Sequence, residues 1–331
     1  METRQLGKAG PVVSELGLGC LGMSDNYGPA DEAESVATIH AALDAGITLL
    51  DTGDVYGMGH NELLIHQALR SYNRDDVTIS VKTGGLRKPD GHWSGFDCRP
   101  EALWNFLSYT LRRLHTDHVD VYRPARVDPK VPIEETVGAM AEMVQAGYVR
   151  AIGLSEVGVE TLRRAHAVHP IADLQIEYSV ISRGIERSIL GACRELGVAI
   201  TAYGVLSRGL LSGRWTPQRQ TTERDFRTRA PRFQPENLPK NLELVERLRR
   251  LAEERETTVA ALAIAWVAAQ GPDIIPVIGA RTRAQLTESL AAADLKLGSD
   301  DLAAIERAVP ADSAAGGRYA DWQIAFLDSE R

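Results

Sequence analysis

Short apolar runs rich in β-branched residues alternate along the chain with longer stretches whose apolar residues recur at helical spacing. In the first long stretch, Val36, Ile39 and Leu43 fall on one helix face. Strands that alternate with helices are typical of parallel βαβ units. We therefore expect one domain over residues 1–331, an α/β fold built as a (β/α)8 TIM barrel with an N-terminal β-hairpin. The predicted strands are Ser14–Cys20, Gly46–Asp51, Val77–Lys82, His118–Pro124, Val149–Ser155, Ala172–Ser179, Val198–Gly204 and Ile274–Ala280.

Two stretches interrupt this alternation. Gln218 to Pro239 is polar and rich in arginine and proline, which predicts a long loop after the seventh strand. An extra helix should follow it near Leu242–Glu256. The segment Asp312 to Arg331 holds a Gly-Gly pair and then Trp322 and Phe326, and we expect this C-terminal tail to fold back over the barrel.

A glycine motif offers a different fold. Gly17, Gly19 and Gly22 form a GxGxxG pattern after a strand, as in Rossmann dinucleotide sites. That fingerprint requires a helix to open at the third glycine. Here Ser24–Pro29 has the composition of a turn, and the first helical pattern begins near Asp31. The spacing therefore favours the barrel.

Composition excludes several classes of function. The net charge of -8 gives no electrostatic reason to expect nucleic acid or an anionic membrane as a partner. Cys20, Cys98 and Cys193 are isolated thiols, and the first ten residues contain no apolar leader segment. We expect a cytoplasmic protein that acts on a small molecule, and the sequence does not indicate its oligomeric state.

Histidine pairs raise the question of a metal. His115 and His118 stand three residues apart, as do His166 and His169. Neither pair is accompanied by a recognisable third or fourth ligand. We expect no metal site.

Polar residues gather at the predicted carboxyl ends of the strands, where parallel barrels carry their chemistry. Asp51 follows the second strand, Lys82 closes the third, and Tyr56 lies in the loop after Asp51. A buried Lys82 needs a counter-ion, which Asp51 on the neighbouring strand can supply. A nearby ammonium should lower the pKa of Tyr56 from about 10, so that the phenol could exchange a proton with a carbonyl oxygen. The hydride for such a reduction must come from a cofactor.

These segments resemble the aldo-keto reductases over nearly the whole chain. The most specific element is the run from Asp51-Thr52 to Tyr56-Gly57 combined with Lys82 in Ser80–Thr83. The resemblance implies a catalytic role for Asp51, Tyr56 and Lys82. Further matching segments are Leu6–Lys8, Leu16–Gly19, Ile152–Ser155, Leu174–Ser179, Ala202–Tyr203, Gly209–Leu211 and Ile278–Arg281, and the loop with Asp225–Arg227 and Pro231–Phe233 is similar to a bacterial branch that uses NADPH and acts on aldehydes.

The resemblance also implies a cofactor site for NADPH. Ser155, Gln175 and Glu156 would hold the nicotinamide carboxamide, with Glu156 where many relatives have Asn. Tyr203 would stack on the nicotinamide ring. Arg281 is the remaining cation for a 2′-phosphate, because Gln285 stands where Arg is usual and Ser289 where Asn is usual. The other implied cofactor residues are Gly19, Cys20, Asp51, Gly204, Val205, Leu206, Ser207, Arg208, Gly209 and Leu211 toward the nicotinamide and pyrophosphate, and Gly279, Ala280 and Glu288 at the adenosine end.

One catalytic position departs from the family. The fourth strand reads Val121–Arg126, and Ala125 occupies the position of the usual histidine. Losing that donor to the carbonyl oxygen typically costs about 3–4 kcal/mol. Arg123 and Arg126 are alternative donors, but the sequence does not fix the direction of their side chains.

Three functions therefore remain open. The first is an NADPH-dependent reductase of aldehydes or ketones. The second is a nucleotide-binding regulatory or partner protein with low turnover, which the missing histidine would permit. The third is a reductase of an activated C=C bond. Retention of Asp51, Tyr56 and Lys82 favours the first, since binding alone would not need this trio.

Overall fold

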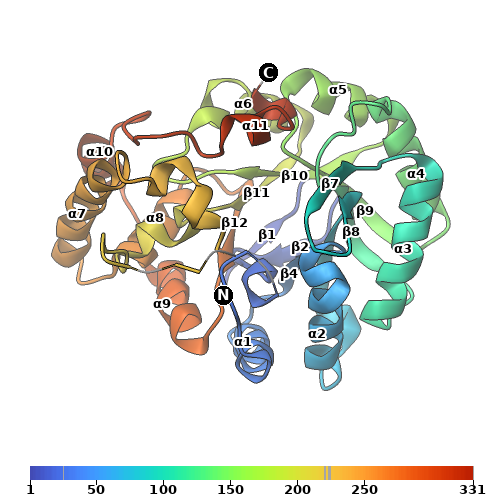
Figure 1. The fold of residues 1–331 in the computed structure, drawn as a ribbon, viewed down its shortest axis with the longest axis horizontal. Coiled ribbons are helices and arrows are strands. Elements are labelled where there is room, and N and C mark those ends of the chain that lie inside the picture. Colours follow the sequence, from blue (N-terminus) through green and yellow to red (C-terminus); the bar gives the residue numbers. More distant parts are fainter. Residues whose placement is uncertain (25, 220, 223–224, 331) are drawn as a thin grey trace.

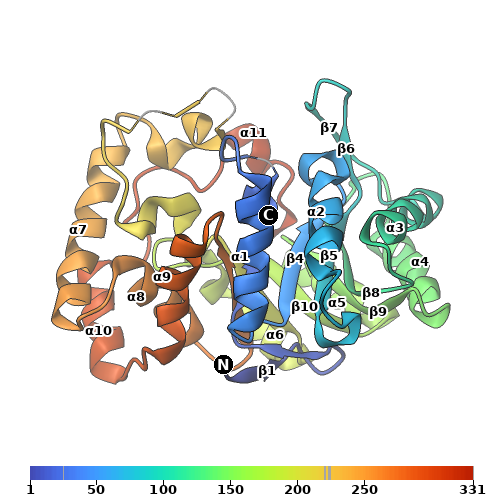
Figure 2. The same cartoon turned by 90° about the horizontal axis from the view of Figure 1, so that it is seen from below.

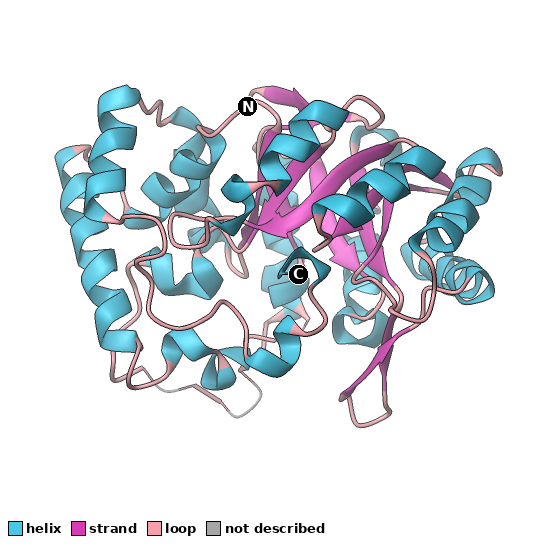
Figure 3. Cartoon of the chain, turned by 90° about the horizontal axis from the view of Figure 1, so that it is seen from above, coloured by secondary structure: helices cyan, strands magenta, loops and turns pink. Residues whose placement is uncertain are grey.

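Parallel strands form a closed barrel at the centre of the protein (Figures 1 and 3). The computed structural model describes residues 1–24, 26–219, 221–222 and 225–330. This barrel confirms the expected (β/α)8 architecture. Around it, in the order in which they pair, lie β3 (Gly17–Gly19), β4 (Leu49–Gly53), β5 (Thr78–Thr83), β8 (Val119–Pro124), β9 (Val149–Ser155), β10 (Ile171–Glu177), β11 (Ala199–Tyr203) and β12 (Ile274–Gly279), which pairs back to β3.

Helices surround the barrel, and two further helices lie outside this ring. The outer two are α7 (Leu238–Glu254), which matches the expected extra helix, and α10 (Ser299–Ala308), both at the left of Figure 1. Since α7 packs against α8, even the outward face of that apolar helix is buried. No helix of the described ranges is long and apolar enough to cross a membrane. The ring contains α1 (Glu32–Asp44), α2 (His60–Leu69), α3 (Pro100–Leu114), α4 (Ile133–Gln145), α5 (Val159–Val168), α6 (Ile189–Leu196), α8 (Val259–Ala268) and α9 (Arg283–Asp294).

An N-terminal hairpin closes one end of the barrel. Its strands are β1 (Thr3–Gln5) and β2 (Val12–Ser14), at the bottom of Figure 2. Leu6 and Val13 bury their side chains against the first inward-facing residues of the strands, including Leu49. Gly7 has φ +65, and a Cβ there would lie 2.0 Å from the carbonyl oxygen of Ala172, so only glycine allows this close approach. The chemistry is thereby confined to the other end.

The next layer of the barrel interior is charged. Arg123 is fully buried and pairs with Asp173 at 2.9 Å, while its Nη2 also donates to Ser80 Oγ at 2.8 Å. A Cβ on Gly153 would lie 2.4 Å from Asp173 Oδ1, so glycine leaves the space that this ion pair fills. Arg123 is therefore committed to the barrel interior.

Three features complete the comparison with the sequence. The antiparallel hairpin of β6 (Gly85–Arg87) and β7 (Trp93–Phe96) was not predicted, and Figure 2 shows it on the side opposite β1. The predicted tail does return to the barrel, where the short helix α11 (Asp321–Ile324) precedes Asp328, which accepts a hydrogen bond from the Gly158 N–H at 2.8 Å. The expected long loop includes residues 220, 223 and 224, which lie outside the described residues, and then two single 3-10 turns, Phe226–Arg229 and Pro231–Phe233.

Candidate active site

Asp51 and Lys82 meet at the carboxyl ends of two neighbouring strands. They lie on β4 and β5, and both are buried, with 4% and 8% of their surface exposed. The Lys82 ammonium donates to Asp51 Oδ1. Asp51 Oδ2 accepts from Gln175 Nε2 at 2.7 Å and from Ser80 Oγ at 3.2 Å. The carboxylate therefore has a cation and two neutral donors, which compensates its burial.

Tyr56 lies above this pair, in the 3-10 turn Tyr56–Gly59. Its ring centroid is 5.5 Å from Lys82 Nζ. Burial raises the pKa of Tyr56 well above 10, the negative charge of Asp51 adds to this, and Arg126 acts against it. The expectation that Lys82 would lower the pKa of this phenol is wrong for the structure, because Asp51 neutralises the ammonium and burial disfavours a phenolate. Tyr56 thus keeps its proton at neutral pH.

The Lys82 ammonium is itself under opposing influences. Burial lowers the pKa of Lys82, Asp51 raises it, and the nearby Arg123 guanidinium lowers it again. The net direction is downward from the usual 10.5. A lysine of this kind is held in place by Asp51 rather than by solvent.

Two of the residues expected to hold a carboxamide have free hydrogen-bonding capacity. The Oε1 of Gln175 is buried and has no partner among the described residues, although its Nε2 is bonded to Asp51. The Ser155 hydroxyl lies at the end of β9 and accepts only a long contact of 3.4 Å from Arg126 Nη1. A buried acceptor and an available hydroxyl donor are complementary to a primary amide.

Glu156 has a different environment. Its side chain is fully buried, and its two oxygens accept from Arg318 at 2.8 and 2.6 Å and from Ser329 Oγ at 2.6 Å. Burial alone would raise the pKa of Glu156, but Arg318 reverses this and holds it at about 2. This carboxylate anchors the C-terminal tail, and its assignment to the carboxamide stays a prediction.

Tyr203 connects the barrel to the tail. Its hydroxyl lies 2.6 Å from Glu156 Oε1 and 2.8 Å from the hydroxyl of Tyr319. The ring of Tyr319 lies in turn 4.5 Å from the Arg208 guanidinium. Sequence reasoning missed Arg318 and Tyr319. It had no periodic or motif signal for them, since the tail follows no regular secondary structure where they lie.

The turn after β11 presents consecutive residues with positive φ. Ser207, Arg208 and Gly209 have φ of 44, 57 and 91, inside the 3-10 segment Ser207–Ser212. Successive backbone N–H groups in such a conformation form an anion-binding concavity. The Arg208 guanidinium pairs with Glu177 at 3.1 Å and adds to the positive charge there. The turn contains most of the residues expected along a pyrophosphate, and Gly204, Val205 and Leu206 lead into it.

The residues expected at the adenosine end gather after β12. Gly279 pairs with Gly19 across the strand ends, and Ala280 follows it. The Arg281 guanidinium donates to the carbonyl oxygens of Tyr27 and Pro29, and it has no carboxylate partner among the described residues. The remaining three residues are on α9, where Gln285 accepts from the Arg281 N–H at 2.9 Å, Glu288 pairs with Arg214, and Ser289 is buried.

Cys20 and the histidines contribute no reactive group here. Burial raises the pKa of the Cys20 thiol, which is fully covered, so it stays protonated. His118 lies at the start of β8, at the opposite end of the barrel from Asp51, and pairs with Asp117. Within the described ranges no group of three or more His, Cys, Asp or Glu side chains could hold a metal ion.

Ala125 lies directly after β8, and its N–H donates to the carbonyl oxygen of Thr83 at 2.8 Å. Its side chain is 7% exposed. Arg126 follows it and turns toward Ser155. Of the two arginines considered as alternative donors, Arg123 is committed to Asp173 and Arg126 is the one at the barrel mouth.

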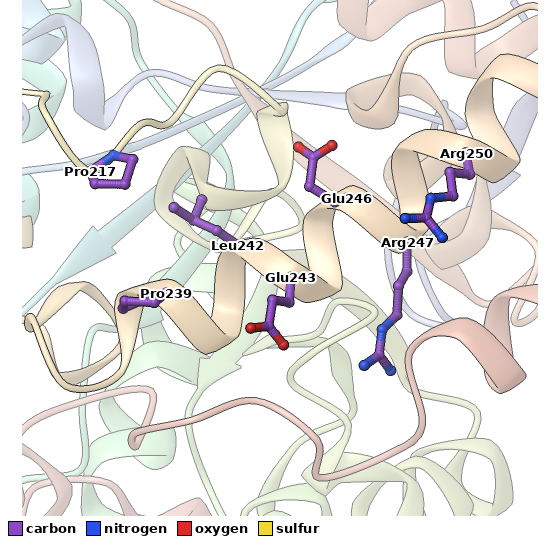
Figure 4. A pocket seen from close by; sticks show the side chains of 7 residues that line it. All are labelled: Pro217, Pro239, Leu242, Glu243, Glu246, Arg247 and Arg250. Atoms are coloured by element: carbon purple, nitrogen blue, oxygen red, sulfur yellow. The ribbon is translucent and has the colours of Figure 1, made fainter.

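Two surface cavities lie along α7, away from this constellation. Figure 4 shows one of about 460 Å³ between Pro217 and the helix, with Leu242, Glu246 and Arg250 on its wall. The other, of about 430 Å³, includes Trp215 and Phe233. Neither is lined by Asp51, Tyr56 or Lys82, so neither is our candidate reaction site.

Comparison with known proteins gives one consistent result. The model of the aldo/keto reductase family matches residues 15–310. A probable aldo-keto reductase 1 of Glycine max is 42% identical over 318 residues, which is 95% of this chain and 91% of that protein. A glycerol dehydrogenase from Gluconobacter oxydans superposes with a TM-score of 0.84 at 30% identity, covering 92% of this chain and 94% of its own. An aldo-keto reductase from Bacillus halodurans, in its holo form, gives a TM-score of 0.78 at 26% identity, with coverage of 93% and 96%.

Proposed function

The chain belongs to the aldo/keto reductase family, and we propose that it reduces an aldehyde or ketone to an alcohol with NADPH. The observation that carries this proposal is the buried cluster of Asp51, Lys82 and Tyr56 beside an unpartnered Gln175 Oε1. A pure nucleotide-binding protein would have no use for a lysine–carboxylate pair beneath a protonated phenol.

The residues at the barrel mouth fit a nicotinamide. Aldo-keto reductases use nicotinamide cofactors, which supply a hydride to the carbonyl carbon when bound. In our proposal Gln175 Oε1 accepts from the carboxamide nitrogen, and the Ser155 hydroxyl donates to the carboxamide oxygen. Tyr203 flanks the ring, and the turn at Ser207–Gly209 receives the pyrophosphate.

Tyr56 supplies the proton in this proposal. As a neutral phenol it donates its hydrogen to the carbonyl oxygen, whose negative charge develops as the carbonyl carbon is reduced. The Lys82 ammonium lies 5.5 Å from the ring and stabilises the tyrosinate that remains. Asp51 holds Lys82 at that position.

NADPH is preferred to NADH in this proposal because of Arg281. Its guanidinium donates only to two backbone carbonyls, so it retains donors and a full charge for a 2′-phosphate. Gln285 and Ser289 are neutral, which leaves Arg281 as the principal cation of that segment.

Replacing Tyr56 tests the proposal. Wild-type protein should consume NADPH, followed by its absorbance, with members of a panel of aldehydes, ketones and enones. Tyr56→Phe should lower carbonyl turnover by about 10²–10⁴ while NADPH binding stays near the wild-type value. Tyr109→Phe, an exposed tyrosine on α3, is the matched control and should change neither. Turnover confined to enones would replace carbonyl reduction by C=C reduction, and NADPH binding with no turnover would favour a regulatory protein.

A further inference from the structure

Arg126 lies at the barrel mouth with its side chain turned inward. Its Nη1 donates to the carbonyl oxygen of Ala125 at 2.5 Å and lies 3.4 Å from Ser155 Oγ, across the ends of β8 and β9. Both acceptors are neutral. The guanidinium is therefore directed across the strand ends and along the rim, not outward from the barrel.

The other buried cations of this region each have a carboxylate. Lys82 pairs with Asp51, Arg123 with Asp173, Arg208 with Glu177 and Arg318 with Glu156. Arg126, by contrast, makes no ion pair within 4.0 Å to any residue that the structure describes. A guanidinium has five N–H donors, and removing it from water without a counter-ion is costly. The barrel mouth thus has an excess of positive charge located on Arg126.

The charge of Arg126 reaches the proposed reacting groups. It is among the charges that lower the pKa of Tyr56 and of Lys82, and the nearby phenols of Tyr203 and Tyr319 act on Arg126 in turn. The guanidinium and the Tyr56 hydroxyl therefore face the same space. Ala125 ends at its Cβ, so no longer side chain at that position competes for it.

We propose that Arg126 binds a carboxylate on the substrate, so that the preferred substrates are carbonyl compounds carrying a carboxylate close to the reacting C=O. This inference rests on the proposed carbonyl reductase function and narrows it to oxo acids. A planar guanidinium is suited to a carboxylate because two parallel N–H···O bonds can form.

The cofactor does not supply the missing anion. The turn expected to bind the pyrophosphate follows β11, and Arg281 follows β12, whereas Arg126 follows β8, which lies across the barrel from β12. Phosphates held at those two places would be on the far side of the mouth from Arg126. The anion that pairs with it must therefore come with the substrate.

The test compares each oxo acid with its own methyl ester, which keeps the carbonyl and removes the charge. Benzoylformate and succinic semialdehyde are the acids used. In wild-type protein kcat/KM should favour each acid over its ester by about tenfold or more, as expected for a charge-assisted hydrogen bond. Arg126→Gln should lower kcat/KM for the acids by about 10- to 100-fold and change the ester values little. Arg126→Lys, which keeps a charge without the fork, should be intermediate.

Binding gives a second readout that needs no turnover. With NADP⁺ present, calorimetric titration of benzoylformate should show a Kd that rises by about 10- to 100-fold in Arg126→Gln. Arg163→Gln is the matched control, because Arg163 is exposed on α5 and pairs with Glu195 on the outer surface. It should leave the acid-to-ester ratio and the Kd unchanged. The ratio is internal to each variant, so a partly unfolded variant does not distort it.

Two outcomes would overturn the proposal. Wild-type protein that does not distinguish acid from ester would do so, and so would an equal loss for acid and ester in Arg126→Gln, which would place the guanidinium on the carbonyl oxygen instead. Failure of the reductase function is distinguishable. In that case neither acid nor ester is reduced, while benzoylformate binding still depends on Arg126.

Discussion

The Lys82 ammonium lies 5.5 Å from the centroid of the Tyr56 ring, while its hydrogen bond goes to Asp51 beneath it. The lysine therefore acts on the phenol through space, and its charge is already balanced in the resting protein. Burial keeps Tyr56 protonated, which suits a proton donor. Stabilisation by Lys82 becomes most useful when the phenol loses its proton.

Breaking the Asp51–Lys82 pair should destabilise the fold. Lys82→Met leaves a buried carboxylate without its cation, and we expect a loss of about 3–5 kcal/mol in the free energy of unfolding. The double variant Asp51→Asn with Lys82→Met removes both charges and should recover most of that loss. Denaturant titration measures both, and neither variant should reduce carbonyls.

The surface pair Lys296–Glu2 provides the control for this prediction. Both side chains are about two-thirds exposed, so Lys296→Met should cost no more than about 1 kcal/mol. If the double Asp51/Lys82 variant is as unstable as Lys82→Met alone, the cost lies in packing and not in an unpaired charge.

Arg281→Ala should separate the two cofactors. Loss of a charge-assisted contact to a 2′-phosphate should weaken NADPH binding by about 10- to 100-fold and leave NADH binding nearly unchanged. Quenching of protein fluorescence on titration with each cofactor measures this. Arg283→Ala, an exposed arginine paired with Glu34, should affect neither cofactor. Equal weakening of both cofactors by Arg281→Ala would contradict the assignment.

Ala125→His restores the residue usual in the family. A donor beside Tyr56 should raise kcat/KM for small neutral aldehydes, by up to about 10²-fold, and should add a limb near pH 6.5 to the pH profile that wild-type protein lacks. The larger side chain should also hinder bulky substrates, because Ala125 is only 7% exposed. A uniform fall for small and large substrates alike would show that another group already fills the position.

Asp54 should make stability depend on pH. Thr83 Oγ1 donates to its Oδ2 at 2.8 Å, but Oδ1 is buried without a partner among the described residues, and burial raises the pKa of Asp54 to about 7 from 3.8. Between those pH values the folded protein holds a proton that the unfolded chain has released. The contribution of Asp54 to the free energy of unfolding therefore falls as pH rises from about 4 to 7, by up to about 4 kcal/mol.

Asp54→Asn removes this titration. The variant should be more stable than wild type at pH 8.5 and similar to it at pH 4, as measured by urea denaturation at both values. Asp76→Asn, at an exposed aspartate before β5, should show no such difference. A variant less stable than wild type at pH 8.5 would mean that the Asp54 carboxylate is ionised and stabilising in the folded protein.

The barrel and the positions of Asp51 and Lys82 could be predicted from the sequence because they depend on local patterns. Strands and helices alternate with periods that are written in consecutive residues, and parallel strands bring their carboxyl ends to one rim. Placing Asp51 and Lys82 at the ends of adjacent strands therefore placed them together. The short hairpin β6–β7 has no such pattern, since its strands are short and rich in glycine and polar residues.

Only the tertiary structure decided the charges around them. The pKa of Tyr56 rises because several elements bury its ring, and no stretch of sequence encodes that burial. Glu156 is neutralised by Arg318, which lies 162 residues further along the chain. The sequence left Arg123 and Arg126 equivalent, but folding buries one against Asp173 and leaves the other without a carboxylate. Which charges compensate one another depends on distances between remote segments, and those distances exist only after the chain has folded.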